Sequence, residues 1–193
     1  MFRNLTLITL LSLSLLACQH SPRKHYFVLS TAPSESVKST ATEKNRLVGI
    51  GPIVVADYLD RLPIVYSEND STLTVLDNDY WAEPLDKGAT RVIGLNLMQL
   101  NQNRSIVDFP WRGDNKPSHS VRVNIHSLTR TKNQASINAS WELVDNTNKT
   151  ILQRKTFSHS LGVASGTKAL VQGYSKLLAA LSQEIDADLR NIH

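Results

Sequence analysis

Apolar and polar residues alternate most regularly between positions 121 and 161, and this alternation predicts a β-meander. Apolar side chains occupy every second position of 121–125 and again of 135–143, with polar residues between them. Such a period of two predicts strands with one face on a core and the other in water. The turn at 130–133 makes these runs an antiparallel hairpin, and the turn at 145–148 leads to a third strand at 150–161.

Two other segments place apolar residues three and four positions apart, which predicts helices. The first covers 85–102 and follows Pro84, a residue that suits the first turn of a helix because its missing N–H is not needed there. The second begins after Gly166 and runs to about residue 191. We expect both helices to pack an apolar face onto a sheet. For the second helix, a contact with a partner helix or a second copy is the alternative.

Shorter apolar runs predict five further strands, at 26–29, 47–55, 64–67, 72–76 and 106–109. Gly49, Gly51 and Pro52 indicate that the buried strand at 47–55 is broken at its end. Residues 57–61 read as a tight turn or a short helix. Segments 30–45 and 110–117 read as loops.

The first eighteen residues have the pattern of a lipoprotein signal. One basic residue, Arg3, precedes twelve uncharged residues at 5–16, a run too short to span a bilayer as a helix. Leu15-Leu16-Ala17-Cys18 follows, with a small residue beside the expected cut and a thiol to accept the lipid. This predicts a signal peptide at 1–17, a lipidated tether at 18–25 and one domain at 26–193. An ordinary signal peptide with a chance cysteine, or a short buried helix, is the alternative.

Composition narrows the expected class further. Cys18 is the one cysteine of the chain, so the mature protein would have no disulfide and no catalytic thiol. Without Arg3, the predicted mature chain has 20 basic and 17 acidic residues, and this small net charge of +3 gives little support for nucleic-acid binding. Gln19 follows the cysteine where an Asp would favour retention in the inner membrane, so we expect the outer membrane.

No arrangement of residues predicts catalysis, a metal or a cofactor. The six histidines lack metal-ligand spacing, and His126 and His159 fall on predicted strands as water-facing residues. No G-x-S-x-G sequence occurs, and the lone Gly49-x-Gly51 is better explained by a strand end than by a phosphate-binding loop. A periplasmic hydrolase therefore has little support.

A few residues remain as candidates for binding. Asp57 and Asp60 lie three apart beside Arg61, which permits acid–base work but more often caps a turn, pairs locally or serves docking. Trp81, Phe109 and Trp111 lie near loops, where an aromatic ring either covers a core or anchors a partner.

Several segments together resemble the family of ABC-type transport auxiliary lipoproteins. The most specific are Asp57-Tyr58-Leu59-Asp60-Arg61 and Trp81-Ala82-Glu83-Pro84-Leu85, and the lipobox, Tyr26–Leu29 and the Gly-x-Gly-Pro strand agree. The resemblance implies an α/β fold: a mixed, largely antiparallel sheet with two main helices packed on it, similar to the TolB amino-terminal domain.

This resemblance also implies a non-enzymatic role. Such a protein is an outer-membrane subunit of an intermembrane, MCE-type lipid transport system that supports envelope integrity. Its expected partners are the periplasmic MCE-domain tunnel protein with its inner-membrane component, and further copies of itself in a ring. The candidate interface or structural residues are Asp57, Tyr58, Leu59, Asp60, Arg61, Trp81, Glu83, Pro84 and Trp111, with Cys18 as the lipidation site. An activator of a periplasmic cell-wall synthase is the alternative function.

Overall fold

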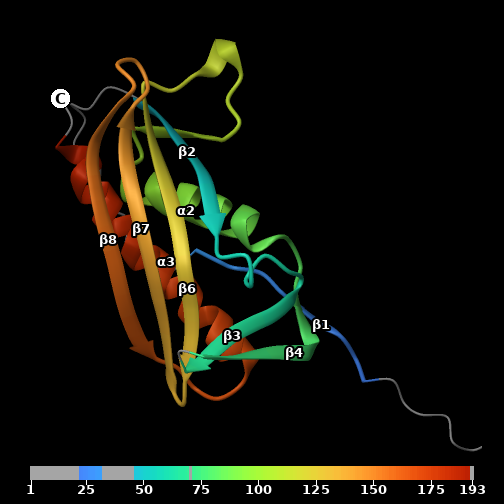
Figure 1. The fold of residues 1–193 in the computed structure, drawn as a ribbon. Coiled ribbons are helices and arrows are strands. Elements are labelled where there is room, and N and C mark those ends of the chain that lie inside the picture. Colours follow the sequence, from blue (N-terminus) through green and yellow to red (C-terminus); the bar gives the residue numbers. More distant parts are fainter. Residues whose placement is uncertain (1–21, 32–45, 70, 192–193) are drawn as a thin grey trace, which may run out of the picture.

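The computed structural model describes residues 22–31, 46–69 and 71–191. The predicted signal peptide, Cys18 and most of the loop at 30–45 lie outside these residues. The described chain forms eight strands, one short 3₁₀ helix and two long helices (Figure 1). In order they are β1 (His25–Phe27), β2 (Arg46–Val55), β3 (Pro63–Asn69), β4 (Thr72–Trp81), α2 (Leu85–Leu100), β5 (Arg104–Asp108), η1 (Gly113–Asn115), β6 (His119–Thr131), β7 (Gln134–Asp145), β8 (Thr150–Gly162) and α3 (Thr167–Arg190).

All eight strands belong to one mixed sheet. β6, β7 and β8 form the predicted antiparallel meander, paired over almost their whole length. On the other edge of β6, β2 pairs in parallel with the first half of that strand, and β3 pairs in parallel at Thr129. β5 extends the sheet beyond β2, while β4 and then β1 extend it beyond β3. The long strand β6 therefore carries two separate smaller arms.

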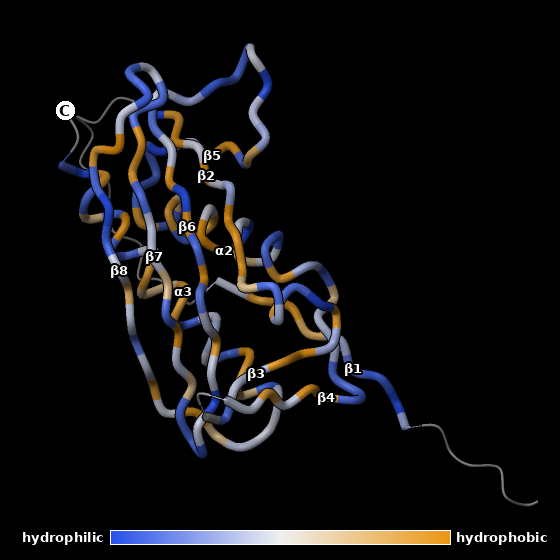
Figure 2. The backbone as a smooth tube through the Cα atoms, in the orientation of Figure 1, coloured by the Kyte–Doolittle hydropathy of each residue, from blue (hydrophilic) through white to orange (hydrophobic). Residues whose placement is uncertain are grey.

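Both helices cover one face of this sheet. α2 packs on β2 and β5, α3 packs on β7, β8 and β6, and the two helices contact each other. Figure 2 shows hydrophilic and hydrophobic residues alternating along β6 and β7. The hydrophobic members face the helices and the polar members, such as Arg122 and His126, face water.

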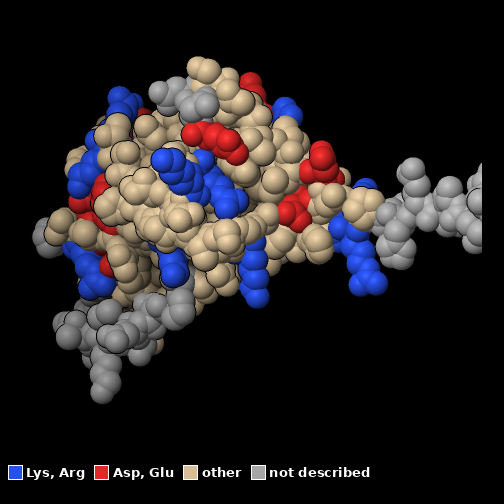
Figure 3. Space-filling view, turned by 90° about the horizontal axis from the view of Figure 1, so that it is seen from below, with Lys and Arg blue, Asp and Glu red and all other residues tan. Residues whose placement is uncertain are grey.

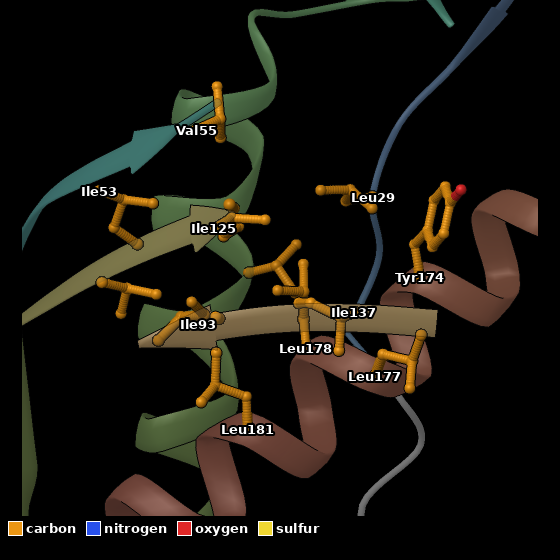
Figure 4. Close-up of a cluster of buried hydrophobic side chains, with 14 of the residues drawn as sticks. Leu29, Ile53, Val55, Ile93, Ile125, Ile137, Tyr174, Leu177, Leu178 and Leu181 are labelled. Atoms are coloured by element: carbon orange, nitrogen blue, oxygen red, sulfur yellow. The ribbon is translucent and has the colours of Figure 1, made fainter. Parts of the chain in front are cut away.

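The core lies between the helices and the sheet. Figure 4 shows Leu177, Leu178 and Leu181 of α3 directed toward sheet residues such as Ile125 and Ile137. Trp141 and Tyr174 are the largest fully buried side chains of the described residues. A spacing of three and four residues on α3 and of two on the strands thus brings both apolar faces together.

The predicted fold class is confirmed, but several boundaries were wrong. β4 continues to Trp81, so this residue ends a strand and does not lead into the helix. The polar segment Asp77–Asp79 stays in the strand despite its poor strand propensity: it lies in a register shift between the β3 pairings at Val75 and Tyr80, and Asp79 pairs with His25 of β1. β2 is not broken at its end, because a register shift between Ile50 and Ile53 absorbs Gly51 and Pro52 within the strand.

Candidate functional site

The segment Trp81–Leu85 leads from the end of β4 into helix α2, and it also contacts the chain at β1. The Trp81 ring is buried in the core, and the Ala82 N–H donates to the Phe27 carbonyl at 2.9 Å. Arg91 of α2 forms an ion pair with Glu83 and donates a second hydrogen bond to the Leu29 carbonyl at 3.0 Å. These contacts fasten the chain after β1 to the body of the domain.

The segment Asp57–Arg61 is a tight turn after β2. Backbone hydrogen bonds join Leu59 to Ala56 at 2.8 Å and Asp60 to Asp57 at 3.2 Å. Only Leu59 is buried, and it anchors the turn in the core. Asp57, Asp60 and Arg61 are exposed and form no ion pair with a described residue, so the predicted local pairing is not found within that part of the chain.

Tyr58 is the half-buried member of this turn. Burial raises the pKa of its phenol, and a hydrogen bond with the backbone of Leu128 offsets part of that rise. The phenol therefore stays protonated at neutral pH and acts as a packing group. The turn reaches the second motif through the Trp81 N–H, which donates to the Leu62 carbonyl at 2.7 Å.

Trp111 lies in a loop that covers β2 at Gly49. A Cβ at position 49 would lie 2.6 Å from Trp111 Cζ2 and 2.6 Å from Pro117 Cγ, so only glycine leaves room for this contact. The indole N–H donates to the Val107 carbonyl at 3.2 Å, and the Phe109 ring meets the indole edge-on at 5.2 Å. Trp111 thus packs on the strand, whereas Phe109 is 46% exposed.

This contact explains the Gly-x-Gly-Pro sequence, which the sequence pattern alone left as a strand break. Gly51 adopts a positive φ of 110°, and the Cβ of Phe109 lies 2.9 Å from where its own Cβ would be. The two glycines therefore mark the strand positions over which the loop closes. Their signal in the sequence was the pairing of glycines two apart in an apolar run.

A buried ion cluster, which the sequence pattern did not predict, joins β5 to α3. Arg104 of β5 contacts Asp186 of α3 at 2.6 Å, and Arg190 contacts the other carboxylate oxygen at 2.8 Å. Arg104 Nη1 also donates to the Leu97 carbonyl at 3.3 Å. Asp186 and Arg190 lie four apart on α3, but Arg104 is far from both in the sequence, and no spacing indicated that it would meet Asp186.

The candidate segments lie at different ends of the long strand β6. The start of β6 pairs with Val48 of β2, next to the Trp111 loop, and Thr129 near its end pairs with β3. The Trp81 segment and β1 belong to this second arm, and Figure 1 shows the loop after β5 and the strand β1 well apart. The structure therefore brings the Asp57–Arg61 turn and Trp81–Leu85 together and leaves Trp111 separate.

Metal-binding clusters and membrane-spanning helices are absent from the described residues. Within 22–31, 46–69 and 71–191, no three His, Cys, Asp or Glu side chains are arranged to hold a metal ion. No helix in the same ranges has the length and hydrophobicity needed to cross a membrane. His126 and His159 are exposed on their strands, as predicted.

Comparison with known proteins identifies the family. The chain is 33% identical over 92 residues to the Intermembrane transport lipoprotein PqiC of Escherichia coli (strain K12), an alignment that covers 47% of this chain and about half, 49%, of that relative. An uncharacterized protein of known crystal structure superposes with a TM-score of 0.71 at 20% identity, covering 87% of this chain and 99% of the other. Protein XCC0632 from Xanthomonas campestris superposes with a TM-score of 0.63 at 12% identity, covering 84% and 92%. Residues 27–186 match the profile of one family, and the chain therefore belongs to the ABC-type transport auxiliary lipoprotein components.

Proposed function

We propose that this chain is a non-catalytic, outer-membrane lipoprotein subunit of an MCE-type intermembrane lipid transport system. The observation that carries the proposal is the family match over residues 27–186. The relative PqiC is named an intermembrane transport lipoprotein, which agrees with this proposal. Lipidation of Cys18 would hold residues 26–193, as one domain, on the periplasmic face of that membrane.

The two ends of the domain would then have different roles. β1 is next to the proposed tether, whereas the loop that carries Phe109 and Trp111 lies at the start of β6. A strand of 13 residues, such as β6, extends roughly 40 Å at about 3.4 Å per residue. The half-exposed Phe109, whose ring meets the indole of Trp111 edge-on, is the candidate contact for the MCE tunnel protein, because rigid aromatic residues serve as interface anchors.

Crosslinking in intact cells tests this docking role. A photo-crosslinking residue would replace Phe109 in one strain and Leu73 in another, since both side chains are about half exposed but belong to different arms of the sheet. We expect position 109 to capture an MCE-domain protein and position 73 not to do so. Capture of a cell-wall synthase from position 109 would instead favour the alternative function.

The homo-oligomeric ring belongs to the same proposal and is supported by the family resemblance. Its test is the mass of the detergent-solubilised, lipidated chain over a range of protein concentrations. We expect a concentration-dependent oligomer. A chain that stays monomeric at high concentration would remove the ring from the proposal.

A further inference from the structure

The residues of β1 and those next to the end of β4 expose aromatic, apolar and basic side chains. We call Lys24, Tyr26, Val28, Leu62 and Tyr80 the β1 surface. Tyr26, Val28 and Leu62 are 64%, 53% and 55% exposed. The Tyr26 and Tyr80 rings lie 5.7 Å apart, and Lys24 Nζ lies 5.2 Å from the centre of the Tyr80 ring. Tyr26 pairs with Tyr80 across the strands, so both rings lie on one face of this arm.

The position of this surface along the chain limits what it can meet. Lys24 follows Cys18 by six residues and Tyr26 follows it by eight. A fully extended chain spans at most about 3.5 Å per residue, so these side chains stay within roughly 20–30 Å of the lipidated cysteine. The lipid anchor therefore keeps the β1 surface close to the bilayer at all times.

The attachment of β1 to the domain fixes the orientation of this surface. His25 Nδ1 lies 3.0 Å from a carboxylate oxygen of Asp79, and the Thr167 hydroxyl at the start of α3 contacts the other oxygen. Further along, Arg91 binds the Leu29 carbonyl. Because the chain is held from residue 25 to residue 29, the β1 surface cannot turn independently of the domain.

The chemistry of the β1 surface fits the headgroup region of a membrane. Tyrosine has an apolar ring and a polar tip, and lysine has an apolar stem and a charged end, so both are favoured where water meets lipid. Figure 3 shows Lys and Arg side chains, next to acidic ones, at the end of the molecule where the described chain starts. Since exposed Asp60 and Asp77 offset part of the basic charge, aromatic and apolar contact must supply much of the attraction.

From these observations we propose that the β1 surface rests on the lipid headgroups of the bilayer that holds Cys18. The partner of this surface is the membrane itself. The inference rests on the lipidation of Cys18 that is part of the proposed function. It adds that the domain sits on the membrane in one orientation, with the Phe109 loop directed away from it, and does not hang on a free tether.

The test uses the lipidated chain in vesicles of phosphatidylethanolamine and phosphatidylglycerol. Cys18 is the one native cysteine, so Leu62→Cys or Leu152→Cys introduces a single free thiol for an environment-sensitive dye. Leu152 is a matched control because it is 45% exposed and lies on β8 near the turn that adjoins the start of β6. Lipids with a nitroxide at the headgroup then quench the dye according to its distance from the membrane surface.

We expect strong quenching at position 62 and little at position 152, with both signals equal once detergent replaces the vesicles. Equal quenching at the two positions, in vesicles that retain the protein, would overturn the proposed contact of the β1 surface with the headgroups. It would leave the anchoring through Cys18 intact. If the chain does not stay on the vesicles, both the anchoring through Cys18 and the contact of the β1 surface are overturned, because no lipid would then hold the β1 surface near the bilayer.

A second measurement needs no label. In the mature chain carrying Cys18→Ser, weak partition to anionic vesicles should fall up to about fivefold on Lys24→Gln, because a basic residue near an anionic surface contributes about 1 kcal/mol. Partition to neutral vesicles should not change. Loss of the same size with Lys149→Gln, an exposed site in the turn before β8, would show general charge attraction and contradict a specific contact of β1.

Discussion

Removing the charge of Asp186 should destabilise this domain more than any comparable change on its surface. The side chains of Arg104 and Asp186 are only 5% and 7% exposed, and their closest atoms are 2.6 Å apart. Asp186→Asn keeps the size of the side chain but leaves the Arg104 guanidinium in the core without a counter-charge. Arg190 cannot compensate, since it is also cationic and contacts the same carboxylate.

The expected loss follows from the cost of an unpaired buried charge. Breaking a buried pair by removing one partner costs about 3–5 kcal/mol, and a domain of this kind has a total free energy of unfolding of about 5–15 kcal/mol. At about 2–4 °C per kcal/mol for a chain of this size, the melting temperature should fall by the order of 10 °C. Urea unfolding followed by circular dichroism and tryptophan fluorescence would give the change directly.

The chain provides its own control in an exposed ion pair. Arg154 and Glu142 lie 2.8 Å apart on the open face of the sheet, with Arg154 66% exposed. Glu142→Gln should cost less than about 1 kcal/mol, because water and salt screen such pairs. If Asp186→Asn costs no more than Glu142→Gln, the argument that burial makes the Arg104 pair indispensable is refuted.

Three further outcomes are expected. Gly49→Ala should lower the free energy of unfolding by about 1–3 kcal/mol and change the fluorescence of Trp111, because the added methyl group must displace the indole; an unchanged spectrum would contradict the close contact. Hydrogen bonds from the backbone and side chain of Asn148 hold the pKa of Asp145 below its ordinary value of 3.8. Asp145→Ala should therefore lower the free energy of unfolding at neutral pH, and its difference from the unchanged chain should disappear as the pH falls below 3.8. A difference that persists in strong acid, measured by urea titration, would count against this reasoning. Cys18→Ser should release the protein from the membrane fraction while leaving its circular dichroism unchanged, and a membrane-bound variant would exclude lipidation as the anchor.

Residue periodicity predicted the parts of this fold whose packing is local. The alternation at 121–125 and 135–143 fixes which side chains of β6 and β7 face the helices, and the spacing along α3 fixes the face that it buries. The turns at 130–133 and 145–148 join strands that are neighbours in both sequence and space. Such contacts can be predicted because both partners appear in one short window of sequence.

Residue periodicity does not predict pairing between segments that are far apart in the sequence. β1 pairs in parallel with β4, and β2 pairs in parallel with both β5 and β6, and no local sequence pattern indicates these pairings. The polar residues before the end of β4 lie in a register shift opposite β3, and β1 pairs with the strand only from Asp79 onward. The Arg104–Asp186 pair joins β5 to α3. A single acidic residue near the end of a helix does not indicate in the sequence that it has a buried partner.

For the candidate site residues too, the sequence indicates which residues matter but not which residues they contact. The sequence marks Trp81 and Glu83 as parts of a motif but does not indicate their contacts: Trp81 pairs with Phe27, and Glu83 pairs with Arg91, which donates to the Leu29 carbonyl. Cys18 and Trp111 remain candidates for anchoring and docking. Asp57, Asp60 and Arg61 keep exposed, unpaired charges within the described chain, which is consistent with an interface and sets up a direct comparison with the Phe109 loop in crosslinking experiments.

The firm attachment of the chain around β1, a few residues after the proposed anchor, would have a consequence for docking. A domain on a free tether must lose its rotational freedom when it binds a partner, and this loss opposes association. Here Asp79 and Arg91 hold the chain on either side of Phe27, only a few residues from the proposed lipid. If the β1 surface also rests on the bilayer, much of that freedom is lost before any partner arrives. Residues that never touch the partner, such as Glu83 and Arg91, would then still influence how readily the Phe109 loop meets it.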